Sequence, residues 1–281
     1  MQVGRRSRTA LAVAHARAYH QIADEPRIFT DPLALRILGE PVLSASDFDH
    51  GLDQNLVRHR RLFIAARSRC ADDTVAATIA RGTRQVVILG AGLDTTAYRN
   101  TSADVRFFEV DHPVTQEWKR HRLSEAGIPI PASLAFVPID FEQSTLAAGL
   151  ADAGLDRTRS ALFVWLGVAA YLTRTSVYDT LRYIAGHSAT SEVVFDYFYP
   201  LASTPHDPTA AQLQARADRV AAAGEPWLSF FTAPEIRKVL QSLGYPRVED
   251  RSAAKLLETY GIRPAVHPTS AGPHLVYAST T

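Results

Sequence analysis

The stretch that most constrains the fold of this 281-residue chain is a short apolar run followed by two glycines, within QVVILGAGLDTTAYR at 85–99. The four apolar residues at 86–89 predict a strand that is buried on both faces. Gly90 and Gly92 permit unusual φ values and let another molecule approach the backbone closely. The polar residues at 94–96 are each suited to cap a helix. A strand, a glycine turn and a helix in this order form the nucleotide site of many open α/β sheets. An ordinary tight turn between a strand and a helix has the same pattern.

A second predicted strand, Arg106 to Val110, ends at an acid, Asp111. An acid at this point, about 20 residues after the glycine turn, is placed to accept hydrogen bonds from a ribose diol. The third glycine of the dinucleotide motif is missing, because Thr95 stands where it is expected. The pattern therefore disfavours a pyrophosphate at the helix start and favours a nucleoside ligand without a diphosphate, such as S-adenosylmethionine.

The motifs GAGLDTTAYR and FFEVDHP resemble the leucine carboxyl methyltransferase family and the broad bacterial group of S-adenosylmethionine-dependent O-methyltransferases around it. The resemblance implies an α/β fold, a doubly wound, mostly parallel, seven-stranded Rossmann-like methyltransferase sheet with a helical cap. It implies one methyltransferase domain over residues 1–281, with an N-terminal helical cap segment at 1–50 and a cap insertion at 199–230. The implied cofactor is S-adenosylmethionine, with S-adenosylhomocysteine as product.

The resemblance also carries the family's cofactor contacts onto matching positions of this chain. It assigns Arg67, the first arginine of RSRCADD, to the methionine carboxylate, which suits a guanidinium because two parallel hydrogen bonds form. It assigns Asp140 and Phe141 to the adenine, although Asp140 is also suited to cap a helix that begins near Glu142. The predicted cofactor contacts are Arg67, Gly90, Ala91, Gly92, Asp111, His112, Asp140, Phe141 and Leu166.

One position departs from the family pattern, which is Trp-Glu-Gly-Val, two variable residues and then Tyr-Leu-Thr. Residues 165–173 are WLGVAAYLT, so Leu166 replaces the glutamate that in the family lies beside the ammonium or sulfonium end of the cofactor. Loss of this contact costs about 1–3 kcal/mol where the partner is left unpaired. The change leaves open a catalytically silent protein that binds a small molecule, or an enzyme that uses the bound cofactor for a step other than methylation.

The implied reaction moves a methyl group to an oxygen of a small-molecule carboxylate or hydroxyl, as in specialised metabolism. A carboxylate is already ionised, whereas a phenol or alcohol benefits from a general base. Tyr171 is the predicted catalytic residue, because its turn leaves the fourth strand at the ligand end of the sheet. Arg5 and Arg8 are candidates to hold an acidic substrate if the N-terminus folds over the site. The other candidate bases, each with a structural role as the alternative, are Tyr19, His20, Tyr98 and His112.

Composition argues against several other classes of protein. A formal net charge of +1 gives no general attraction to nucleic acid or an anionic membrane, and no apolar run approaches the ~20 residues that span a bilayer. The single cysteine, Cys70, excludes an internal disulfide and a cysteine-based metal cluster and is typical of a cytoplasmic protein. The histidines lack the spacing of metal ligands. A short-chain dehydrogenase requires a lysine four residues after a tyrosine, and no lysine of this chain has that spacing. We therefore expect a small-molecule partner and leave a homodimer open; the Arg-rich start is also compatible with a transit peptide.

Periodicity and capping residues predict the remaining elements. Helices are expected at 9–22, directly after Asp31-Pro32, and at 53–81, 113–126, 176–185, 210–223 and 232–243. Further strands are expected at 134–138, 161–166, 192–197, 245–249 and 274–279. Trp227 and Phe230 are interpreted as core residues rather than ligand contacts.

Overall fold

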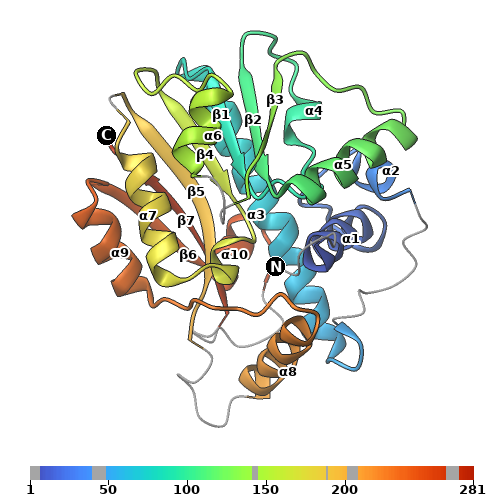
Figure 1. Cartoon of the computed structure of the whole chain (residues 1–281). Coiled ribbons are helices and arrows are strands. Elements are labelled where there is room, and N and C mark those ends of the chain that lie inside the picture. Colours follow the sequence, from blue (N-terminus) through green and yellow to red (C-terminus); the bar gives the residue numbers. More distant parts are fainter. Residues whose placement is uncertain (1–6, 40–48, 141–144, 188, 201–207, 264–271) are drawn as a thin grey trace.

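The computed structural model describes residues 7–39, 49–140, 145–187, 189–200, 208–263 and 272–281. Its centre is a seven-stranded sheet in the order β3-β2-β1-β4-β5-β7-β6 (Figure 1). The first five strands pair in parallel, and β7 lies antiparallel between β5 and β6. The predicted doubly wound, mostly parallel sheet is therefore confirmed. The strands are β1 Gln85–Leu89, β2 Arg106–Asp111, β3 Leu134–Pro138, β4 Ala161–Trp165, β5 Ser191–Phe198, β6 Arg247–Ser252 and β7 Pro273–Ser279.

Two apolar cores, one on each face of the sheet, hold the helices to it. Alternate residues of β1 divide between them, Val86 and Ile88 on one face and Val87 and Leu89 on the other, as the predicted two-sided burial requires. The first face is covered by α3 Gln54–Ala80 and α10 Ala253–Thr259, with α4 Thr96–Arg99 and α5 Pro113–Glu125 alongside. The second face is covered by α6 Leu146–Asp152, α7 Arg174–Ala185 and α9 Ala233–Ser242 (Figure 1).

Three further helices lie beside the carboxyl ends of the parallel strands: α1 Arg8–Ala23, α2 Ala34–Leu38 and α8 Pro208–Ala222 (Figure 1). They belong to the two segments that the sequence predicts as a cap. Glu225, just after α8, joins these segments, since its carboxylate accepts hydrogen bonds from the Ser7 hydroxyl at 3.0 Å and the Arg8 backbone N–H at 2.8 Å.

A buried cluster fastens α1 to α3. Asp24 accepts two hydrogen bonds from Arg61, at 2.7 and 2.8 Å, and one from Nδ1 of His20 at 2.9 Å. Nε2 of His20 accepts from the Phe29 backbone N–H, so Nδ1 is the nitrogen that carries the proton. Burial alone raises the pKa of Asp24, but the hydrogen bonds from Arg61 and His20 outweigh it and hold the pKa well below its usual range.

Most predicted elements are confirmed, and the differences are local. The helix after Asp31-Pro32 begins later than predicted, at Ala34, because the Asp31 carboxylate caps the preceding turn by accepting from Leu33 N. Helix α10, which follows β6 directly, was not predicted from the sequence. No helix in the described parts of the chain is long and apolar enough to cross a membrane.

Candidate functional site

The glycine turn packs so closely against its neighbours that a side chain at Gly90 would clash. Gly90 has φ +64° and Gly92 has φ +49°, the left-handed region that favours glycine. A Cβ at Gly90 would lie 2.3 Å from Cγ2 of Val168, the residue after the Leu166-Gly167 pair. The following helix, α4, has four residues, so the turn offers no extended helix N-terminus for a diphosphate. The two glycines are therefore required by the packing of the turn itself, since a Cβ at Gly92 would also lie 3.2 Å from Cβ of Ala10.

Asp111 ends β2 beside this turn, as predicted for a ribose contact. Its Oδ2 accepts from Gly92 N at 2.6 Å and its Oδ1 from His112 N at 2.7 Å. Burial raises the pKa of this carboxyl group, and the two backbone hydrogen bonds oppose that effect. Each carboxylate oxygen has a further lone pair, so the group remains able to accept from a diol. The ring of His112 caps α5 by accepting from Val114 N at 3.3 Å. His112 therefore lies next to Asp111 and acts there as a helix cap.

Arg67 projects from α3 to the carboxyl end of β4. It forms an ion pair with Asp196 of β5, and the other oxygen of Asp196 accepts from Gly167 N at 2.5 Å. Gly167 has φ +73°, and a Cβ there would lie 3.0 Å from Nη2 of Arg67. The buried Nε of Arg67 has no hydrogen-bond partner among the described residues. This donor is available to a bound carboxylate.

Asp196 is a site residue that the sequence reasoning missed. The signal was present, because a carboxylate within the apolar strand EVVFDY has to be paired when it is buried. Leu166 is half-buried and packs with the apolar residues of the α3 face. The carboxylate next to the Gly167 turn is therefore Asp196 of β5, because position 166, where the family has a glutamate, is a leucine.

The predicted adenine contacts lie at the end of β3. The backbone N–H of Ile139 donates to the Asp111 carbonyl at 2.9 Å, which ties this strand end to the ribose position. Asp140 follows and is half-buried. The next described helix, α6, begins at Leu146 and is capped by Thr145. Glu142, where the alternative places the start of a helix capped by Asp140, lies outside the described residues. Phe141 lies outside the described residues, and so does Arg5.

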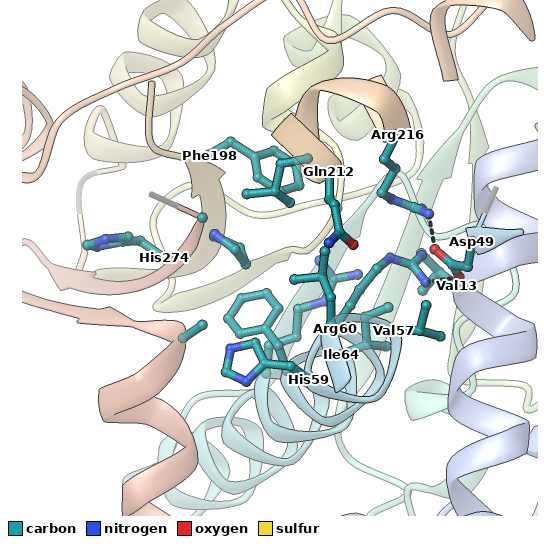
Figure 2. Close-up of a pocket in the computed structure, with 18 of the residues that line it drawn as sticks. Val13, Asp49, Val57, His59, Arg60, Ile64, Phe198, Gln212, Arg216 and His274 are labelled. Atoms are coloured by element: carbon teal, nitrogen blue, oxygen red, sulfur yellow. Dashed lines mark hydrogen bonds and ion pairs between the residues drawn. The ribbon is translucent and has the colours of Figure 1, made fainter. Parts of the chain in front are cut away.

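A cavity continues from Arg67 and Gly167 between α1, α3 and α8 (Figure 2). Its walls are largely apolar. Tyr171 lines it, and so do Trp227 and Phe198, whose rings stack with centroids 4.3 Å apart. The interpretation of Trp227 as a core residue is therefore incomplete, because this side chain also faces the cavity. Lining residues with apolar side chains include Val13, Leu52, Leu56, Val57, Phe63, Ile64 and Leu213.

The five candidate bases lie in different surroundings. Tyr171 lines the cavity. His20 is fully buried on Asp24, Tyr98 donates to Glu109 at 3.3 Å, and the Tyr19 ring lies under the Arg61 guanidinium. Those three side chains hold the fold together rather than face an acceptor. His274 also borders the cavity, but its ring is held by Asp250 at 2.7 Å and is turned away from Arg60 and Gln212 in Figure 2.

Comparisons with known proteins decide the family. The model of the leucine carboxyl methyltransferase family matches residues 10–185. This chain belongs to that family. It is 32% identical over 268 residues to the putative S-adenosyl-L-methionine-dependent methyltransferase YktD of Bacillus subtilis, with 87% of this chain and 88% of the relative aligned. A second relative with a similar name, from Mycolicibacterium paratuberculosis, is 34% identical over 64% of this chain and 63% of its own length.

Solved structures of low identity share the fold of this leucine carboxyl methyltransferase family member. A DUF574 family protein from Streptomyces avermitilis has a TM-score of 0.59 at 16% identity, covering 95% of this chain and 97% of that one. A structure described as a putative methyltransferase from Thermobifida fusca has a TM-score of 0.54 at 15% identity, covering 94% and 93%. The predicted methyltransferase class and its cofactor, S-adenosylmethionine, are confirmed at the level of the family.

The residues present fit that cofactor. Beside the glycine turn, the Asp111 carboxylate supplies an acceptor for a diol, and the Nε of Arg67, which has no partner among the described residues, supplies a donor for a carboxylate. The described residues contain no group of three or more histidine, cysteine or acidic side chains that could hold a metal ion. Burial raises the pKa of the Cys70 thiol, which argues against this residue as a nucleophile.

Proposed function

We propose that this protein transfers a methyl group from S-adenosylmethionine to an oxygen of a small molecule bound in the cavity between α1, α3 and α8. The observation that carries the proposal is the junction at Arg67 and Gly167. These residues border the cavity and also stand at the end of β4, next to the glycine turn. A cofactor on the turn and an acceptor in the cavity would therefore be neighbours.

Each group has a role that follows from its position. Asp111 binds the ribose, and Arg67 binds the methionine carboxylate while Asp196 fixes the direction of its guanidinium. When bound, the cofactor supplies a methyl group on a positively charged sulfur. The apolar walls exclude water from the acceptor oxygen, and Tyr171 donates a hydrogen bond that orients it. Fixing the oxygen in line with the methyl group supplies much of the rate in such a displacement.

The acceptor is a carboxylate or a hydroxyl, and the setting is specialised metabolism in the cytoplasm. The lone cysteine supports a reducing compartment. The cap helices support a small acceptor, because α1 and α8 close over the cavity and are joined through Glu225.

An acceptor screen with methyl-labelled S-adenosylmethionine tests the proposal, and the Tyr171→Phe variant tests the role of the hydroxyl. Mild alkali distinguishes the products, since methyl esters release methanol and methyl ethers do not. We expect Tyr171→Phe to lower kcat by about tenfold or more with little change in cofactor affinity. Tyr260→Phe is the matched control, because Tyr260 contacts Asp73 on the far side of α3. Label transferred to nitrogen or carbon, or to no acceptor at all, would contradict the proposal.

A second candidate is a protein that binds the cofactor without methyl transfer, and Leu166 is the observation that favours it. The family's glutamate is absent, and Arg67 is already neutralised by Asp196. A Leu166→Glu variant distinguishes the two functions. Gain of methyl transfer in this variant, from a wild type that binds the cofactor but transfers nothing, would establish the second candidate.

A further inference from the structure

The cavity has a charged end, where two arginines from different helices meet one carboxylate. Arg60 of α3 donates from Nη1 to Oδ2 of Asp49 at 2.9 Å, and Arg216 of α8 donates from Nη1 to Oδ1 of the same residue. Figure 2 shows the two side chains reaching Asp49 from opposite walls of the cavity. The side chains of Asp49 and Arg216 are 3% and 8% exposed, so water screens these charges weakly.

The described lining of the cavity is unbalanced towards positive charge. It contains three arginines, Arg60, Arg67 and Arg216, and a single acid, Asp49. Arg67 has its own ion pair with Asp196, and the guanidinium groups of Arg60 and Arg216 converge on Asp49 within largely apolar walls. Burial lowers the pKa of Arg60 to about 9, and the nearby charge of Arg216 adds to that effect.

Hydrogen-bond donors at this end are available to an anion. The hydrogen bond from Arg60 to Asp49 uses one of the five N–H groups of its guanidinium, and the side chain is 20% exposed where it lines the cavity. Gln212 of α8 extends into the same space in Figure 2. Its Oε1 accepts from the Asp53 backbone N–H at 2.9 Å, so its amide NH₂ group remains a donor.

We propose that this end of the cavity is an anion-binding subsite, which selects acceptors that have an apolar body and a carboxylate held by Arg60 and Arg216. The apolar body lies along Leu56, Val57 and Leu213. The inference rests on the proposed function, because it names the class of acceptor for that reaction.

Paired probes that differ only in charge test the subsite without any turnover. The probes are 4-phenylbutyrate and 4-phenylbutan-1-ol, titrated into the whole protein at pH 7.5. Binding is followed by calorimetry and by tryptophan fluorescence, to which Trp227 in the cavity lining contributes. We expect the carboxylate to bind about tenfold or more tightly than the alcohol, as charge-assisted hydrogen bonds predict. Arg60→Gln and Arg216→Gln should each reduce that preference to about threefold or less and leave the affinity for the alcohol within a factor of about two.

Each variant leaves Asp49 with one arginine partner, so neither strands a buried charge. Arg69→Gln, on the exposed side of α3, is the matched control and should keep the wild-type preference. Equal affinities for the two probes in the wild type, no binding of either up to about 10 mM, or an unchanged preference in both variants would overturn the subsite. A protein that shows the preference but never transfers a methyl group would instead contradict the proposed function alone.

Discussion

The Asp111→Asn variant tests the cofactor site, and the contacts of Asp111 allow the loss of stability and of affinity to be estimated. Two backbone N–H groups converge on this carboxylate, from Gly92 at 2.6 Å and from His112 at 2.7 Å. An asparagine has one carbonyl oxygen to accept from them, and its NH₂ group faces the other N–H. One backbone donor beside the glycine turn is thereby left unpaired, and the charge that would face the ribose is removed.

The magnitudes follow from these contacts. An unpaired buried donor costs about 1–3 kcal/mol, which for a chain of this size lowers Tm by about 2–6 °C. Loss of a charged acceptor for the ribose costs about 1.5–3 kcal/mol of binding, or about 10- to 100-fold in affinity for S-adenosylhomocysteine. A substitution at Asp111 is therefore expected to lower stability as well as cofactor affinity, because the carboxylate also organises the turn.

Urea denaturation and calorimetric titration with S-adenosylhomocysteine measure the two effects separately. Asp104→Asn is the matched control, because Asp104 is an exposed acid paired with Arg84 and lies away from the turn. Its stability and affinity should stay close to those of the wild type. An Asp111→Asn protein with wild-type stability and wild-type affinity would refute both the turn-organising role and the ribose assignment.

Three other variants test the cofactor contact of Arg67, the close packing of Gly90 and the buried cluster at Asp24. Arg67→Lys replaces a forked donor by a point charge, so calorimetry should show about tenfold or more loss of S-adenosylhomocysteine affinity; full affinity would remove Arg67 from the site. Gly90→Ala places a Cβ 2.3 Å from Val168, so urea denaturation should show a loss of about 1–3 kcal/mol, and more than for Gly127→Ala, where φ is +60° but nothing lies within 4 Å; equal losses would contradict the close packing. The pKa of Asp24 is lowered on folding, so its contribution to stability is present above about pH 4 and is lost as pH falls below it; Asp24→Asn should flatten the acid limb of unfolding between about pH 5 and 3, and an unchanged limb would count against the cluster.

The elements of the sheet were predictable because they follow from local patterns. The apolar run at 86–89 and the glycines after it gave β1 and its turn, and Asp111 lies where an acid at the end of the second strand was expected. Caps were equally local, as the capping box of Thr232 and Glu235 at α9 shows. Such signals depend on residues that are close in sequence, so they can be recognised in a single sequence.

The acceptor side of the site was not predictable, because it depends on residues far apart in sequence. Asp49 and Arg216 meet across 167 positions, and Arg67 and Asp196 across 129. On α3, Arg60 has the appearance of one more residue on a basic, solvated helix face. The packing of α8 against α3 turns that residue towards a cavity, and no periodicity within either helix encodes this arrangement.

The most direct test of the central claim is a calorimetric titration of the wild-type protein with S-adenosylhomocysteine. The account predicts one site per chain with a dissociation constant of roughly 1–100 µM, because Asp111, the glycine turn and Arg67 are all in place despite the leucine at position 166. No heat of binding up to millimolar ligand would contradict the assignment of this turn as a cofactor site.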